Sequence, residues 1–160
     1  LQGAQVATGD ILWFLHADTR VSPNSISSIM QAERGAIGGY FRFVFDGPPA
    51  WPMLILEPAI ALRSRFGTPY GDQGIFVKRT AYFKVGGHAP WPLFEEVPLV
   101  KGLRNLGHFQ PLLDSIWVDS RRWQRDGWWH RTLQNRMLAL KFILGVSPDR
   151  LAKSYHSQSS

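Results

Sequence analysis

The apolar run ILWFL, residues 11–15, is the feature that most constrains the fold of this chain. A turn-forming Gly-Asp pair precedes it, and the polar residues His16 and Asp18 follow it at once. Five consecutive apolar residues between turn-forming and polar residues indicate a strand that is buried on both faces and ends in a functional loop. Helices that cover both faces of such a sheet are typical of α/β proteins.

Strand and helix patterns alternate along the rest of the chain. Alternating aromatic and β-branched residues predict a strand over residues 40–45, and further strands are expected over residues 74–79 and 115–120. Helical spacing and capping residues predict helices over residues 22–34, 51–66, 81–85, 94–105 and 131–144. No repeat, low-complexity block or long linker interrupts this order, so the sequence predicts a single α/β domain over residues 1–160. Residues 154–160 are expected to be a frayed end.

The opening segment LQGAQVATGD is similar to the end of a helix, and the first residue is Leu1. We therefore expect that the amino-terminal part of the domain is missing.

The best candidate for a membrane helix, residues 51–62, is interrupted by two prolines and Glu57. It falls short of the roughly 18 apolar residues that a span requires, so we expect no spanning segment, while contact with a membrane surface stays open.

The charge balance and the lack of cysteine limit the partners and the kinds of site. Eighteen Lys and Arg against 12 Asp and Glu give a formal charge of +6, which favours phosphates, nucleic acid or acidic lipid as partners. With no cysteine, disulfides and thiolate metal sites are excluded, and His and carboxylate groups are left as metal ligands. This composition is consistent with a reducing compartment, and we expect a cytoplasmic protein.

His16 and Asp18 directly follow the apolar strand and are candidate ligands for a divalent cation. In an extended segment, residues two apart point to the same side, so the two side chains can converge on one ion. Such an ion would neutralise a diphosphate leaving group. The alternative is an ordinary turn in which Asp18 caps the next helix, and the three residues HAD alone fit that alternative better.

Asp72 and Gln73 stand between two glycines at the entrance to the predicted strand at residues 74–79. The glycines permit tight backbone geometry, and the polar side chains can bind sugar hydroxyls. A simple turn is the alternative.

Glu95 and Glu96 begin a predicted helix, where one carboxylate can deprotonate an acceptor hydroxyl. Alternatively, the pair only complements the positive end of the helix dipole.

The segment at Ser120 joins Arg121 and Arg122 to Trp123. Two guanidinium groups beside an indole can bind diphosphate oxygens and pack against a sugar or a base. The alternative is a basic, aromatic patch that holds a terminal helix and contacts lipid head groups. Both interpretations are compatible with each other.

Four segments, taken in order, resemble successive motifs of bacterial family-2 glycosyltransferases, especially the branch whose acidic metal motif reads HAD. These segments are ATGDILWFLHADT, GDQGIFVKR, GGHAPWPLFEEV and SRRWQRDGW. The later segment LGVSPDRLAKSY also resembles the end of that branch, so the resemblance runs from about Gly3 to Tyr155. It implies a GT-A fold, a Rossmann-like mixed sheet flanked by helices, that lacks the first strands, which hold the nucleotide.

The resemblance also implies roles for single residues. Asp18 matches the last acid of the DxD metal motif and His16 the position of the first, which implies a divalent metal, Mg or Mn. Glu96 stands where the family carries its catalytic Asp, and Glu95 matches the preceding Glu. Arg122 and Trp123 match the RW pair of the QxxRW element, although Asp119 replaces its Gln.

The function that the resemblance implies is the transfer of a sugar, with inversion, from a nucleotide-diphosphate sugar donor to an unknown acceptor. The acceptor is a glycan, a lipid or a small molecule, peripheral contact with the inner face of a membrane is compatible with it, and no nucleic acid is expected. Two alternatives stay open. One is a basic, Trp-rich, non-enzymatic module that binds nucleic acid or an anionic membrane, and the other is an inactive fragment of the enzyme.

Overall fold

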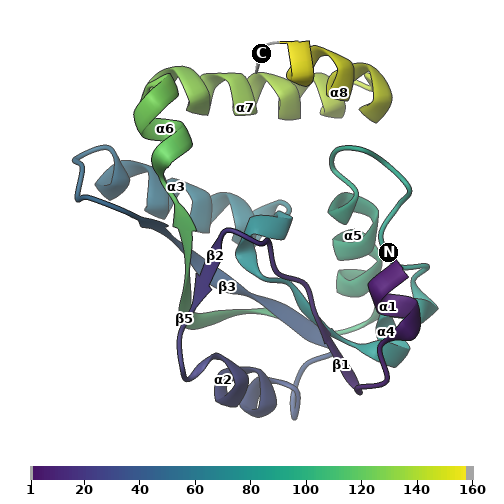
Figure 1. Cartoon of the computed structure of the whole chain (residues 1–160). Coiled ribbons are helices and arrows are strands. Elements are labelled where there is room, and N and C mark those ends of the chain that lie inside the picture. Colours follow the sequence, from purple (N-terminus) through teal and green to yellow (C-terminus); the bar gives the residue numbers. More distant parts are fainter. Residues whose placement is uncertain (1, 158–160) are drawn as a thin grey trace. The chain divides into compact units, whose positions relative to one another are not determined.

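A computed structural model describes residues 2–157 of the chain, and the side chains of residues 2–154. Its contacts form two compact units, each of which is described by itself (Figure 1). The sheet unit contains the chain up to Ala89 together with Glu96–Asp119. The tail unit contains Pro90–Glu95 and the chain from Ser120 onward. The sequence, which predicted a single domain, contains no linker that marks this division.

The sheet unit is built on one mixed sheet of five strands, which agrees with the predicted α/β class. The strands are β1 (Ile11–Trp13), β2 (Thr19–Val21), β3 (Gly38–Asp46), β4 (Phe76–Lys78) and β5 (Phe109–Asp119). Their order across the sheet is β1-β4-β3-β5-β2. β3 and β5 run parallel, and the other neighbours are antiparallel. The longest pairing, between β3 and β5, therefore forms the middle of the sheet.

β3 runs through the middle of the sheet, and one of its faces is aromatic and buried. Phe41, Phe43 and Phe45 are buried, whereas Arg42 is exposed. The strand starts with Gly38 and Gly39, where neighbouring strands approach closely. A Cβ atom built on Gly39 would lie 2.2 Å from the carbonyl oxygen of Gln110 in β5. No larger residue fits at this point without moving the backbone of the sheet.

Helices cover both faces of the sheet and form two hydrophobic clusters. The helical elements of the sheet unit are α1 (Gln2–Val6), α2 (Ser25–Ala32), α3 (Met53–Phe66), the 3-10 turn η1 (Gly71–Gln73), α4 (Arg79–Lys84) and α5 (Glu96–Leu106). One cluster joins β1, β3 and β4 to α1, α4 and α5, with Leu99 and Leu103 fully buried. The other joins the sheet to α2 through Ile29 and Ala32. α3 packs along β3, where Glu57 accepts a hydrogen bond from the backbone N–H of Phe45 (2.9 Å).

The tail unit consists of α6 (Arg121–Asp126), α7 (Trp128–Ile143) and α8 (Pro148–Ser157), together with the segment at residues 90–95. Gly127 and Gly145 separate the three helices and have positive φ angles of 84° and 90°. The ring of Phe142 in α7 stacks on Phe94 at 4.6 Å. The expected frayed end overlaps α8, which continues to Ser157, and residues 158–160 lie outside the described residues.

The first strand was predicted over residues 11–15 with both faces buried, but β1 ends at Trp13, lies at the edge of the sheet, and is followed by the exposed Leu15. Two further strands also differ from the prediction. β2 has only three residues, which is too short for a detectable alternation, and pairing with β5 defines it. β5 begins at Phe109, although the strand was predicted only from Ser115. Pro111 lies in this early part, where β3 is the partner and the pairing with β2 covers only residues 116–118. Proline is tolerated more easily there because this part of β5 has a neighbouring strand on one side only. In the part of the chain described, no helix has both the length and the apolar composition needed to cross a membrane.

We predict that Gly39→Ala destabilises the protein by about 2 kcal/mol or more, because the new methyl group clashes with the backbone of β5. Gly3→Ala is the matched control, since a Cβ atom there has no neighbour within 4 Å and alanine favours the helix. Urea unfolding curves measure both. Equal stability of the two variants would contradict the close approach of β3 to β5.

Candidate functional site

Three of the four segments that the sequence singled out meet at Gly71, in the sheet unit. The N–H group of Gly71 donates a hydrogen bond to Oε1 of Glu96 (2.7 Å). A Cβ atom built on Gly71 would lie 2.6 Å from the same Oε1 atom and 2.7 Å from Nε2 of His16. The loop after β1, the turn η1 and the start of α5 therefore bring an imidazole and a carboxylate to one backbone position.

Hydrogen bonds from β1 fix the turn at this position. The indole Nε1 of Trp13 donates to the carbonyl of Gly74 (3.1 Å), and the N–H group of Phe14 donates to the carbonyl of Ile75 (2.8 Å). Gly74 has a φ angle of 55°. A side chain at Gly74 would meet Ile116 Cδ1 at 2.7 Å, so glycine is required by both conformation and space. The loop that carries His16 and Asp18 thus starts from a fixed point.

One carboxylate oxygen of Asp72 accepts no hydrogen bond from the described residues. The residue is partly exposed, but its Oδ1 atom is buried and has no hydrogen-bond partner among the described residues. Burial raises the pKa of this carboxyl group; Arg63 and, when protonated, His16 act against the rise, and Asp18 adds to it. Both predicted metal ligands are therefore electrostatic neighbours of Asp72. An unsatisfied buried carboxylate oxygen in a loop is typical of functional sites.

Gln73, in contrast, binds the protein itself. Its side chain is only 1% exposed, and its Oε1 atom accepts a hydrogen bond from Ser64 Oγ (2.6 Å). Its amide nitrogen lies 3.4 Å from the carbonyl oxygen of Phe41. The adjacent Arg63 guanidinium packs over the ring of Tyr70, 4.2 Å from the centroid. Gln73 thus anchors η1 to α3 and β3 and holds Asp72 in place.

Arg104 ties the far end of α5 to the same region. Its guanidinium group donates hydrogen bonds to the backbone carbonyls of Gly67, Ser64 (2.8 Å) and Arg65 (3.4 Å). These carbonyls are at the end of α3, where a cation is favoured by the helix dipole. α5 is consequently fixed by Glu96 at its first turn and by Arg104 at its last.

The backbone just before Glu96 is strained. Among residues 2–157, Phe94 is the one non-glycine residue with a positive φ angle, 62°. Such a conformation costs on the order of 1 kcal/mol or more and persists where surrounding contacts maintain it. Glu95, which precedes the buried Glu96, belongs to the tail unit together with Phe94. No residue type in this segment indicated the strain, since Phe rarely adopts this conformation.

His16 and Asp18 are the residues that the sequence predicts as metal ligands. His16 and Asp18 are exposed at the turn after β1. Within the described residues, no group of three or more His, Asp or Glu side chains is arranged to hold a metal ion. Mg²⁺ commonly uses one or two carboxylates and completes its sphere with substrate phosphates and water. Asp18 and His16, beside the unpartnered Asp72 oxygen, fit a site of that kind.

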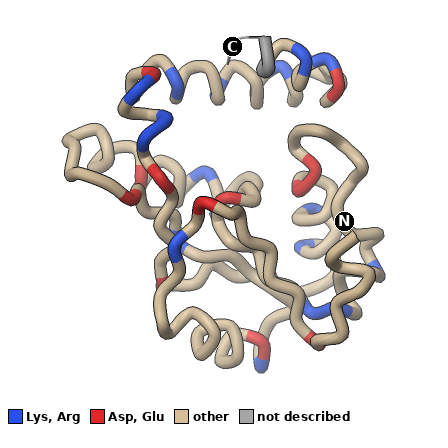
Figure 2. The backbone as a smooth tube through the Cα atoms, viewed as in Figure 1, with Lys and Arg blue, Asp and Glu red and all other residues tan. Residues whose placement is uncertain are grey.

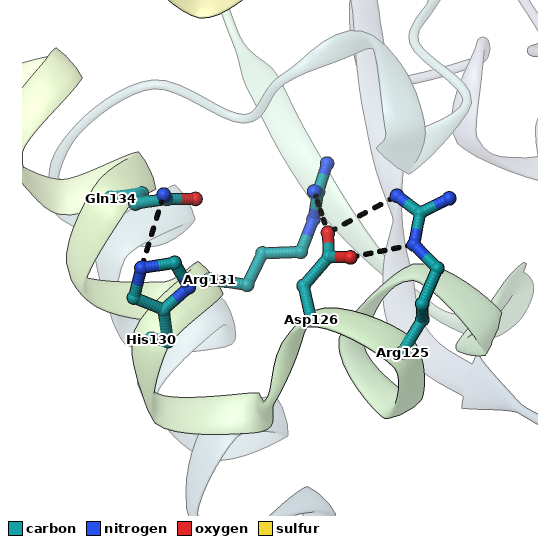
Figure 3. A network of polar contacts seen from close by, with 5 residues as sticks. All are labelled: Arg125, Asp126, His130, Arg131 and Gln134. Atoms are coloured by element: carbon teal, nitrogen blue, oxygen red, sulfur yellow. Dashed lines mark hydrogen bonds and ion pairs between the residues drawn. The ribbon is translucent and has the colours of Figure 1, made fainter. Parts of the chain in front are cut away.

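Arg122 and Trp123 lie in α6 of the tail unit. Arg122 is exposed, and the guanidinium group of Arg131 packs over the ring of Trp123 at 5.4 Å. Arg131 also donates a hydrogen bond to Asp126 (2.7 Å), which binds Arg125 as well (Figure 3). The hydrogen bond from Arg125, followed by that from Arg131, lowers the pKa of the Asp126 carboxyl group. The predicted role of Arg122 and Trp123 in binding diphosphate stays a prediction.

Comparison of this chain with models of known protein families, with curated proteins and with solved structures finds no match. Its function is therefore inferred from its residues and their geometry.

We predict that Asp72→Asn stabilises the protein at about pH 7. Because the pKa of Asp72 is raised in the folded state, this state binds the proton more tightly than the unfolded state does. Ionisation therefore costs stability as the pH rises above the ordinary value of 3.8, and the amide removes that cost. Urea unfolding should show a gain at neutral pH that disappears at acid pH. A loss of stability at neutral pH would mean that attraction to Arg63 outweighs burial.

Proposed function

We propose that this chain carries the metal- and acceptor-binding part of a glycosyltransferase that uses a nucleotide-diphosphate sugar. The observation that supports the proposal is the convergence at Gly71, where Glu96 and His16 approach one backbone position from segments far apart in the sequence. Each of these segments resembles a motif of family-2 glycosyltransferases. The mixed five-stranded sheet with helices on its faces is compatible with a GT-A fold, which is part of the proposal.

In this proposal, Glu96 is the catalytic base. Its carboxylate would take the proton of the acceptor hydroxyl while the acceptor oxygen forms a bond to the anomeric carbon. The bond from that carbon to the diphosphate oxygen breaks in the same step, and its electron pair leaves with the nucleoside diphosphate. One displacement inverts the anomeric centre without a covalent enzyme intermediate. The hydrogen bond from Gly71 orients the carboxylate for this task.

The other site residues would bind the donor. Asp18 and His16 would hold Mg²⁺ or Mn²⁺, which when bound neutralises charge on the departing diphosphate. The unpartnered Oδ1 atom of Asp72 would accept a hydrogen bond from a sugar hydroxyl, and Gln73 would position it. Arg122 would supply a cation for phosphate oxygens, and Trp123 would supply an aromatic surface for the sugar.

We predict that Glu96→Gln lowers turnover roughly 100-fold or more and leaves donor affinity nearly unchanged, because only the proton acceptor is lost. The protein expressed from its complete coding sequence is assayed for release of nucleoside diphosphate from a panel of donor sugars. Glu95→Gln is the matched control, an adjacent carboxylate that should retain most of the turnover. An unchanged rate in Glu96→Gln would remove Glu96 as the base.

We predict that Asp18→Asn weakens Mn²⁺ binding about tenfold or more, because an amide replaces the one charged ligand of the pair. Titration followed by electron paramagnetic resonance measures the affinity, and circular dichroism checks that the fold is retained. Asp10→Asn is the control, since this exposed carboxylate lies at the opposite end of β1. Equal Mn²⁺ affinity in both variants would exclude Asp18 as a ligand.

A further inference from the structure

The positive charge of the chain is concentrated in its last part. Residues 120–157 contain eight Lys and Arg but only two Asp, whereas residues 1–119 contain ten of each sign. Figure 2 shows these cations on α6, α7 and α8. The formal charge of +6 is therefore a property of the tail and not of the segment that carries the proposed catalytic site. A local field of this kind attracts an anionic partner to the tail.

One face of α7 is apolar and exposed. Leu133, Met137 and Leu140, with Leu144 directly after the helix, are 60%, 50%, 55% and 74% exposed. Their spacing of four, three and four residues places them on a single helical face, here named the α7 stripe. Trp129 extends it by one turn and is about half exposed. A continuous exposed apolar surface on a helix is typical of a binding surface.

Cations flank the α7 stripe on both sides. Arg136 and Lys141 are exposed, and each is one residue away from a member of the stripe, so they lie along its two edges. The start of the helix is fixed by Asp126, which binds Arg125 and the buried Arg131 at the corner between α6 and α7 (Figure 3). The helix therefore presents leucine and methionine in the middle and positive charge at the margins.

We propose that α7 lies in the plane of an anionic membrane surface. The aliphatic stripe would enter the boundary between head groups and acyl chains, and the flanking cations would contact anionic head groups. Nucleic acid would match the charge but offers no environment for an aliphatic stripe. A second copy of the chain would match the stripe but would set like charges against each other.

The helix α3 of the sheet unit does not match the α7 stripe and its flanking cations better than a lipid surface does. α3 also exposes apolar residues, among them Leu54 and Phe66, but it carries Arg63 and Arg65 near its end. Its acidic residue, Glu57, already accepts a hydrogen bond from the backbone of β3. The cations beside the α7 stripe would therefore lack an acidic partner on α3. An anionic lipid surface supplies both the apolar medium and the negative charge.

Flotation with lipid vesicles tests this inference. One preparation contains phosphatidylglycerol and phosphatidylcholine at about one part to three, and the other contains phosphatidylcholine alone. We expect the chain to bind the mixed vesicles and the double variant Met137→Glu, Leu140→Glu to bind them at least roughly tenfold more weakly. The matched control is Leu54→Glu, Leu113→Glu, which adds the same charge at residues that are 79% and 95% exposed on the sheet unit. It should bind within about twofold of the parent chain.

A second variant separates charge from apolar contact. Arg136→Gln with Lys141→Gln should weaken binding to the mixed vesicles by roughly fivefold for each cation and leave any binding to phosphatidylcholine unchanged. Equal binding by the parent and the stripe variant would overturn the inference. So would binding to a nucleic acid duplex in preference to vesicles, or a dimer in light scattering that the stripe variant abolishes. Glu96→Gln should float as the parent does, so this inference and the proposed transferase activity fail separately.

Discussion

The hydrogen bond from Gly71 to Glu96 is the contact on which the candidate site depends. Glu96 is 7% exposed, and a buried carboxylate requires donors that offset its lost hydration. This donor is a backbone N–H group, so the fold of η1 contributes directly to the position of the carboxylate. Since Arg104 fixes the other end of α5 to α3, the helix cannot shift without breaking contacts at both ends.

Much of the sheet unit was predictable because its patterns are local. The presence of a strand after Asp10, the aromatic strand β3 and the helix α3 all follow from runs of apolar residues. The prediction that the first of these strands is buried on both faces was wrong, because β1 lies at the edge of the sheet and only Leu12 in it is buried. β2 and the first half of β5 were not predictable, since pairing with distant strands defines them. α8 was missed although Ser147 before Pro148 is a usual signal for a helix start. The division into two units had no signal, because the contacts that define it are long-range.

For the candidate site, the sequence predicted the residue types but not their arrangement. HAD and GDQG each fit an ordinary turn, and only the fold brings His16 and Glu96 to Gly71. Asp72 and Gln73 were treated alike as polar residues for a sugar. In the structure, Gln73 is buried in contacts with α3, while Asp72 keeps an unpartnered oxygen. Adjacent residues of a tight turn point in different directions, and composition does not reveal which one faces the core.

The strained residue Phe94 belongs to the same compact unit as α7. It lies two residues before Glu96, and its ring stacks on Phe142, which faces away from the α7 stripe. A membrane that holds α7 by its stripe would therefore also hold the segment that leads into α5. Strain at a position like this one is retained when a rigid neighbour maintains it, and the stacked ring supplies that neighbour. Binding of α7 to lipid would therefore restrict the motion of the chain at Phe94 and Glu95, which belong to the same compact unit as α7.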